Sequence, residues 1–211
     1  MDDEPEGSAD HALDAIVQLV QAGDSHAARA RCEELLAAEP ANADALAWLG
    51  RIAMDQFRWD DAISAFDRVL RIRVDPWTLG NLGMCHWKIG HLDEAEYCLR
   101  GAVEVKPGFT RAHVSLANVL HALQRFDDAL AQLTLAENLA ARDHQIPMRR
   151  GCTLAALGRY DEAQQMFARS VELASSLASQ AAVAIENSRL YEDIERLFEG
   201  LVTAAVTAIE S

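Results

Sequence analysis

The side chains of this chain best suited to metal binding or nucleophilic chemistry are seven histidines and four cysteines. The histidines stand at positions 11, 26, 86, 91, 113, 121 and 144, and no two have the i, i+4 spacing with which a helix shares a metal. The sequence contains no CxxC pair, glycine-rich phosphate loop or GxSxG motif. It therefore predicts no catalytic residues, no metal and no cofactor, and a protein that is not an enzyme.

Paired carboxylates could serve as an acid and a base, but here they recur at one fixed repeat position. The pairs are Asp60-Asp61, Asp93-Glu94, Asp127-Asp128 and Asp161-Glu162. Acidic side chains are favourable in the first turn of a helix, where the backbone N–H groups carry partial positive charge. We interpret these pairs as helix starts and not as catalytic groups.

The same period orders the rest of the chain. Central alanines stand at Ala28, Ala62, Ala95, Ala129 and Ala163, which are 34, 33, 34 and 34 residues apart. Twelve residues before each alanine comes a residue that is mostly small (Ile16, Gly50, Gly83, Ala117, Gly151), and four after it one that is mostly bulky (Cys32, Phe66, Leu99, Leu133, Phe167). Small residues let two helices cross closely and the bulky residue fills the space beside the crossing. Glycines at 23, 90 and 158 suit the left-handed conformation that ends a helix.

With this spacing the chain resembles the tetratricopeptide repeat family, whose unit is two antiparallel helices. The resemblance implies an all-α fold, a right-handed α-solenoid of five helical hairpins plus a long C-terminal helix. The expected organisation is a disordered acidic tail over residues 1–8, five units over 9–177 and a capping or dimerisation helix over 178–211. The five units are 9–42, 43–75, 76–109, 110–143 and 144–177.

The resemblance also predicts a concave groove that binds a peptide or protein segment, and so a non-catalytic interaction scaffold. In this family the first helix of each unit lines the groove. The corresponding positions here are Trp48, Arg51, Met54, Trp77, Asn81, Met84, Trp87, Lys88, Arg111, Asn118 and His121. Aromatic, Met and Arg side chains combine contact area with directed hydrogen bonds, which suits peptide anchoring. The alternative for two of them is that Trp48 and Trp77 only pack between repeats.

Some members of the family hold the C-terminal carboxylate of a peptide with a Lys/Asn/Asn/Lys/Arg set. The matching positions here are Ala47, Arg51, Asn81, Arg111 and Ser115. Only Asn81 is identical, so we expect a different ligand chemistry.

Composition limits partners and location. The chain has 33 acidic and 19 basic residues and a net charge of −14, which opposes nucleic-acid binding. No apolar stretch approaches the ~20 residues that a membrane-spanning helix requires. The four cysteines, without a paired framework, are predicted to be buried thiols in a reducing compartment. We expect a soluble cytoplasmic protein.

The last segment differs from the repeats, because no glycine or proline interrupts residues 160–199. A heptad seam runs through Val183, Leu190, Ile194, Leu197 and Leu201, with Asn187 as its polar member. Two interpretations stay open. The helix caps the last hairpin, or it projects and forms a homodimer.

Residues 178–197 also look like the last helix of bacterial GAF sensor domains and the signalling helix after it, and residues 198–211 are similar to the entry into an HD-GYP domain. The alternative function is therefore a regulatory or dimerising fragment of a bacterial signalling enzyme, a cyclic di-GMP phosphodiesterase, whose catalytic domain is absent here. A natural truncation and a fusion of a repeat domain to a borrowed dimerisation helix both fit this pattern.

Overall fold

The computed structural model describes the backbone of residues 6–210 and the side chains of residues 9–187, 189 and 196. All regular structure in this part of the chain is α-helical. The helices are α1 (Glu6–Gln21), α2 (Ser25–Ala38), α3 (Ala43–Asp55), α4 (Trp59–Ile72), α5 (Pro76–Lys88), α6 (Leu92–Val105), α7 (Thr110–Ala122), α8 (Phe126–Leu139), α9 (Gln145–Ala156) and α10 (Tyr160–Glu210). The expected all-α solenoid of five hairpins is confirmed.

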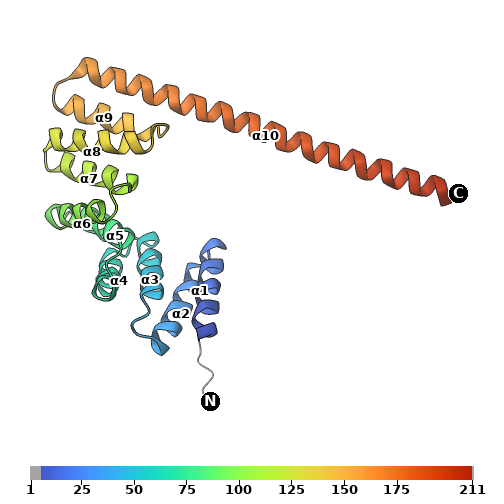
Figure 1. Ribbon diagram of the computed structural model, residues 1–211, viewed down its shortest axis with the longest axis horizontal. Coiled ribbons are helices and arrows are strands. Elements are labelled where there is room, and N and C mark those ends of the chain that lie inside the picture. The colour runs from blue at the N-terminus through green and yellow to red at the C-terminus, as the bar shows by residue number, and fades with distance from the viewer. Residues whose placement is uncertain (1–5, 211) are drawn as a thin grey trace.

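The hairpins follow one another along an arc (Figure 1). Each helix packs against the next, and α1, α3, α5, α7 and α9 also contact one another in succession. Among the described residues, α2, α4, α6 and α8 do not contact one another in this way. We call the first set the inner helices and the second set the outer helices. Because the inner helices approach one another more closely, the stack curves and its concave side is made of inner helices.

The crossing between the two helices of a hairpin is built as the sequence predicted. All five central alanines are buried. A Cβ atom added to Gly50 would lie 2.5 Å from the ring of Phe66, and one added to Gly151 would lie 2.5 Å from the ring of Phe167. Glycine is therefore required at these two crossings, because the ring occupies the place of a side chain.

The turn inside each hairpin uses one left-handed residue. Gly23, Gly90 and Gly158 have φ values of 79°, 85° and 78°, which confirms the predicted helix ends. The equivalent residues of the other two hairpins, Phe57 and Gln124, take φ values of 58° and 61°. Left-handed backbone costs a residue with a Cβ about 1–2 kcal/mol, so these two turns carry strain that the three glycine turns avoid.

The N-terminal boundary differs slightly from the expected one. Helix α1 begins at Glu6, so residues 6–8 belong to a helix and not to the acidic tail that was expected to reach residue 8. Residues 1–5 of that expected tail lie outside the described part of the chain.

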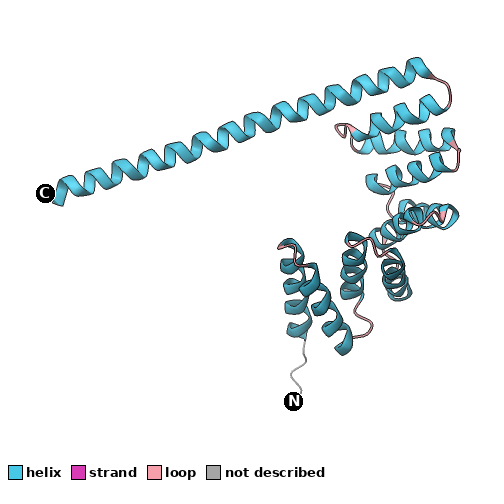
Figure 2. Ribbon diagram, turned by 180° about the vertical axis from the view of Figure 1, so that it is seen from behind, coloured by secondary structure: helices cyan, strands magenta, loops and turns pink. Residues whose placement is uncertain are grey.

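Helix α10 is a single helix of 51 residues with no break at residue 177. It serves as the second helix of the fifth hairpin and continues as the expected C-terminal helix, because no glycine or proline interrupts it before residue 200. At about 1.5 Å per residue it is roughly 75 Å long. Figure 2 shows it extending away from the arc. Its first turns pack against α9, and Arg169 forms an ion pair with Glu137 of α8 at 2.7 Å.

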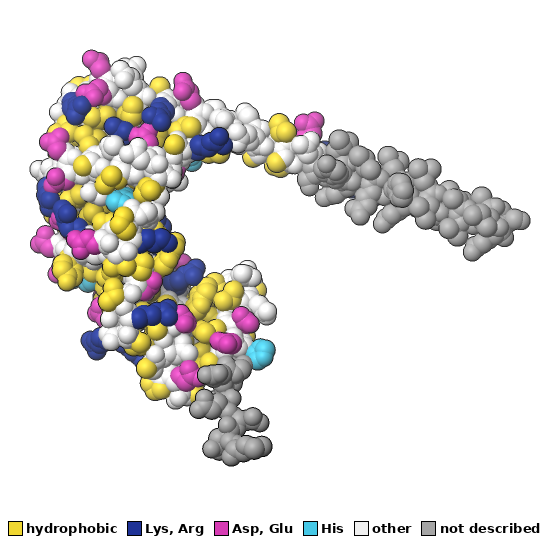
Figure 3. All heavy atoms as spheres, in the orientation of Figure 1, with side chains coloured by type: hydrophobic (Ala, Val, Ile, Leu, Met, Phe, Trp, Pro, Cys, Tyr) yellow, Lys and Arg dark blue, Asp and Glu magenta, His cyan; other side chains and the backbone are white. Residues whose placement is uncertain are grey.

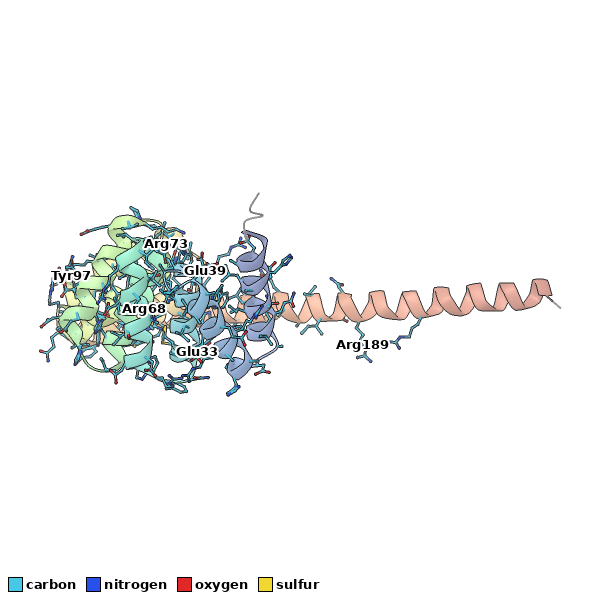
Figure 4. All side chains as sticks on the ribbon, turned by 90° about the horizontal axis from the view of Figure 1, so that it is seen from below. Glu33, Glu39, Arg68, Arg73, Tyr97 and Arg189 are labelled. Atoms are coloured by element: carbon cyan, nitrogen blue, oxygen red, sulfur yellow. The ribbon has the colours of Figure 1, made fainter. Side chains whose placement is uncertain are left out.

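The projecting part of α10 is exposed to solvent. Every described side chain from Ser175 to Asn187 is exposed, Val183 among them. Figure 4 shows Arg189 far from the hairpins, pointing outward from the helix. The side chains of the other predicted seam residues, Leu190, Ile194, Leu197 and Leu201, lie outside the described residues.

Candidate peptide-binding groove

A groove of about 620 Å³ lies on the concave side, across three successive inner helices. We call it the concave groove. It is lined by Met84, Trp87 and Lys88 of α5, by Thr110, Arg111, Val114, Ser115 and Asn118 of α7, by Gln145 and Arg149 of α9, and by Ala140 and Asp143 of the preceding loop. Helix periodicity explains this set, since residues three and four apart, such as Arg111, Val114, Ser115 and Asn118, share one face.

A smaller hollow of about 270 Å³ adjoins the concave groove and shares Trp87, Asn118 and Arg149 with it. We call it the apolar hollow. Its other walls are Ala117, His121, Ala122, Leu133, Cys152 and Thr153. Polar side chains stand among its walls, but more of its exposed surface is apolar than polar, so it suits one bulky apolar side chain.

Hydrogen bonds join neighbouring inner helices across the floor of the groove. Arg111 Nη2 donates to Asn81 Oδ1 at 2.8 Å, which links α7 to α5, and Arg149 Nη1 donates to Asn118 Oδ1 at 2.8 Å, which links α9 to α7. These bonds fix the guanidinium groups before any ligand arrives. A groove prepared in this way loses less side-chain entropy on binding.

Two aromatic rings lie together outside the groove lining, at the N-terminal ends of α5 and α7. Trp77 is 49% exposed, and its ring lies 4.3 Å from that of Phe109, which is buried. Lys106 and Arg111 lie 4.8 and 5.6 Å from the centre of the Trp77 ring. Trp77 therefore packs on one side and remains exposed on the other. Packing between repeats and contact with a ligand are both compatible with this position.

The charge of the groove is positive although that of the chain is negative. Its described lining carries the three cations Lys88, Arg111 and Arg149 against the single carboxylate of Asp143. Burial lowers the pKa of Arg111, and the nearby charge of Arg51 lowers it further. Figure 3 shows Lys and Arg side chains along the inner edge of the arc.

The structure brings most of the sequence-predicted groove residues together. Met84, Trp87, Lys88, Arg111 and Asn118 line the concave groove, and His121 lines the apolar hollow with its Nδ1 3.2 Å from Thr153 Oγ1. The carboxamide of Asn81 accepts the hydrogen bond from Arg111 and so supports the groove from beneath.

Three predicted residues on α3 do not line the concave groove. Trp48 packs against the core cluster of α1, α2 and α3, with the Arg51 guanidinium 4.2 Å from its ring centre. Met54 packs against the cluster formed by α3, α4, α5 and α6. Trp48 is half-buried, so it packs between repeats, and its role in binding stays a prediction.

Sequence reasoning missed the contribution of α9, which supplies Gln145, Arg149 and Cys152. These residues occupy the second, sixth and ninth places of the fifth unit, the same places that supply Arg111, Ser115 and Asn118 in the fourth. Applying the spacing rule to one more unit finds them.

The thiols are not all buried, as had been expected. Cys32, Cys85 and Cys98 are buried, and burial raises the pKa of Cys85 to about 12. Cys152 is exposed, so the prediction is wrong for this residue. It lies at a groove position of α9 and not at the crossing between helices.

The described residues offer neither a metal site nor a membrane-spanning helix. No cluster of three or more His, Cys, Asp or Glu side chains there could hold a metal ion. No helix in that part of the chain is both long and apolar enough to cross a membrane.

Comparison with known families agrees with the hairpin architecture. Sequence models of the tetratricopeptide repeat match residues 19–79, 81–143 and 148–177. The chain belongs to the tetratricopeptide repeat family. The three matches end at residue 177, and the resemblance of residues 178–211 to GAF and HD-GYP proteins gains no support from them.

Solved tetratricopeptide repeat structures share this fold. A crystal structure of MamA has a TM-score of 0.72 at 21% identity, covering 77% of this chain and 95% of MamA. MamA from Desulfovibrio magneticus RS-1 has a TM-score of 0.74 at 18% identity, covering 80% and 96% of the two chains. YrrB, described as a TPR protein with an unusual peptide-binding site, has a TM-score of 0.67 at 19% identity, covering 77% and 84%. At such identities the likeness shows the fold alone.

Among curated proteins, the mitochondrial import receptor subunit TOM70 of Saccharomyces cerevisiae is 28% identical over 78 residues. The match covers 37% of this tetratricopeptide repeat chain and 13% of the receptor.

Proposed function

We propose that this protein is a non-catalytic scaffold that binds a segment of another protein in the concave groove. The observation that carries the proposal is the groove itself, which crosses α5, α7 and α9 and combines the ring of Trp87 with guanidinium groups already held by hydrogen bonds. A peptide is the natural ligand for such a surface, because aromatic and arginine side chains contribute most of the binding energy in protein interfaces.

The similar proteins give this proposal some support. YrrB is described as having a peptide-binding site, and TOM70 is named an import receptor. Both are statements about those proteins. The four cysteines of this chain are free thiols, which favours a reducing compartment such as the cytoplasm.

The test is a selection of displayed random peptides on the full-length protein, followed by affinity measurements on variants. Trp87→Ala combined with Arg111→Ala should weaken binding of the selected peptides at least tenfold while the helical circular dichroism stays unchanged. The matched control replaces an exposed aromatic residue and an exposed arginine of the outer helices, Tyr97→Ala with Arg71→Ala, and should bind like the wild type. Figure 4 shows Tyr97 at the edge of the molecule opposite to α10. Selected peptides that bind equally well to the groove variant would refute the site.

A second candidate function is homodimerisation through α10. The observation in its favour is that α10 projects from the arc with exposed apolar side chains, including Val183 and Ile185, at 57% and 70% exposure. The heptad pattern from Val183 onward fits a two-stranded coiled coil, in which an Asn such as Asn187 selects the paired register.

Analytical ultracentrifugation tests the dimer directly. The full chain should sediment as a dimer, and Val183→Glu combined with Leu190→Glu should convert it to a monomer. The control Arg189→Glu introduces the same side chain outside the heptad seam and should leave the dimer intact. A full chain that sediments as a monomer at high micromolar concentration would exclude this function.

A further inference from the structure

We propose that the segment bound in the concave groove is acidic: its side-chain carboxylates pair with Lys88, Arg111 and Arg149, and one bulky apolar side chain enters the apolar hollow beside Trp87. This inference rests on the proposed function and names the chemical class of the partner. It is opposite to what the net charge of −14 suggests.

The first argument is that the groove cations lack carboxylate partners. On the outer helices arginines pair with carboxylates, as Arg100 does with Glu96 at 2.8 Å. In the groove, Arg111 and Arg149 donate instead to amide oxygens, and Lys88 lies 5.0 Å from the centre of an indole ring. None of the three forms an ion pair within the described part of the chain.

The second argument is that the groove concentrates like charge and partly removes it from water. Arg111 is destabilised in its charged form by burial and by Arg51, and no neighbouring carboxylate compensates. Arg149 Nε is buried without a hydrogen-bond partner in the described structure. A ligand carboxylate relieves both penalties, since charge-assisted hydrogen bonds are stronger than neutral ones and strengthen further away from water.

The third argument concerns length and spacing. Neighbouring inner helices are about 10 Å apart, so α5, α7 and α9 together span roughly 20 Å. An extended chain advances about 3.3 Å per residue, so a segment of about six residues crosses the groove. Carboxylates that engage Arg111 on α7 and Arg149 on α9 are then about three residues apart. The apolar hollow adjoins α7 and α9, so it receives a side chain between or next to these two acidic residues.

Nucleic acid is the other polyanion that such cations attract. The groove favours a protein segment, because the three cations lie on separate helices around apolar surface and do not form the continuous basic stripe that follows a phosphate backbone. The carboxylate excess of the chain also repels a long polyanion beyond the groove.

The experiment uses the peptides selected on the full-length protein. Those that lose binding to Trp87→Ala should contain more Asp and Glu than the unselected library. One such peptide, synthesised with a fluorescent label and an amidated C-terminus, should bind about tenfold or more weakly to Arg149→Glu, because a charged hydrogen bond is lost and a repulsion is introduced. Arg71→Glu on an outer helix is the control of equal charge and should bind like the wild type.

Each outcome decides between the two proposals. Selected peptides that depend on Trp87 but are not enriched in acidic residues overturn this inference and leave the proposed function intact. Peptides that do not depend on Trp87 overturn both. Loss of binding on amidation alone shows recognition of a C-terminal carboxylate and overturns the inference, as does a labelled single-stranded oligodeoxynucleotide that binds the groove more tightly than the peptide. When the selection is repeated on the Arg149→Glu variant, enrichment of Lys and Arg in place of Asp and Glu supports the inference.

Discussion

The close crossing of α3 and α4 makes a quantitative prediction about Gly50. An alanine there would place its Cβ 2.5, 2.8 and 2.8 Å from three ring atoms of Phe66. Phe66 is fully buried, so its ring has no free space to move into. Overpacking of this kind costs about 1–3 kcal/mol. Replacing a glycine by alanine in a helix interior stabilises the folded state by about 1 kcal/mol, which offsets part of this cost. Gly50→Ala should therefore destabilise the protein by up to about 2 kcal/mol.

A matched control and a rescue are both present in the chain. Gly101 also lies in a helix interior, but a Cβ there would be 3.5 Å from the nearest atom, an ordinary contact. Gly101→Ala should therefore stabilise by about 0.5–1 kcal/mol. The fourth hairpin pairs Ala117 with a leucine at the equivalent crossing, which predicts that Phe66→Leu relieves the clash of Gly50→Ala.

The assay is urea denaturation followed by circular dichroism for the two single variants, the double variant and the control. The free energy of unfolding of the double variant should exceed the value expected from adding the two single changes by about 1–2 kcal/mol, which is within the range for residues in contact. Equal stabilisation by Gly50→Ala and Gly101→Ala would refute the close approach of the helices. Additive effects of Gly50→Ala and Phe66→Leu would show that the ring is not what the alanine meets.

Two further predictions follow from the turns and the thiols. Phe57→Gly and Gln124→Gly should each stabilise the protein by roughly 1 kcal/mol by relieving left-handed backbone, or about 2–4 °C in the thermal midpoint; lower midpoints for both would contradict this. A thiol reagent at pH 8 should react rapidly with Cys152 alone in the native protein, since burial raises the pKa of Cys32 to about 11 and of Cys85 to about 12; fast modification of a Cys152→Ser variant would disprove the burial.

Sequence reasoning was most accurate where close helix packing imposes the same requirement on every hairpin. Each crossing needs a small residue opposite a bulky one, so Gly50 with Phe66 and Gly151 with Phe167 could be paired from spacing alone. The glycine turns were equally predictable, because only the left-handed conformation closes the hairpin. Phe57 could be placed at such a turn by alignment, but its side chain gives no sign that its φ is positive.

The groove was harder to predict because nothing in the packing fixes its residues. Arg149 belongs to the groove through its hydrogen bond to Asn118, and a bond between two repeats leaves no mark in the sequence of either one. Cys152 was assigned to the core because free cysteine is usually buried, yet its helix turns it to the concave side. Trp48 could not be assigned from its type alone, since a large aromatic residue at a groove position also packs against the core cluster beside it.

Net charge is a poor guide to the partner of this fold, for a reason that lies in the solenoid itself. A curved stack of hairpins has two faces that do not share residues. The net charge of −14 adds the carboxylate excess of the outer helices to a groove in which Lys88, Arg111 and Arg149 have no carboxylate partner in the described structure. At physiological ionic strength charges are screened over about 8 Å, less than the width of one helix. A ligand in the groove therefore responds to the cations within its reach and hardly at all to the carboxylates of the outer helices. Raising the salt concentration should therefore weaken binding of an acidic peptide to the groove. Selection of basic peptides would instead show that the whole acidic surface attracts the partner.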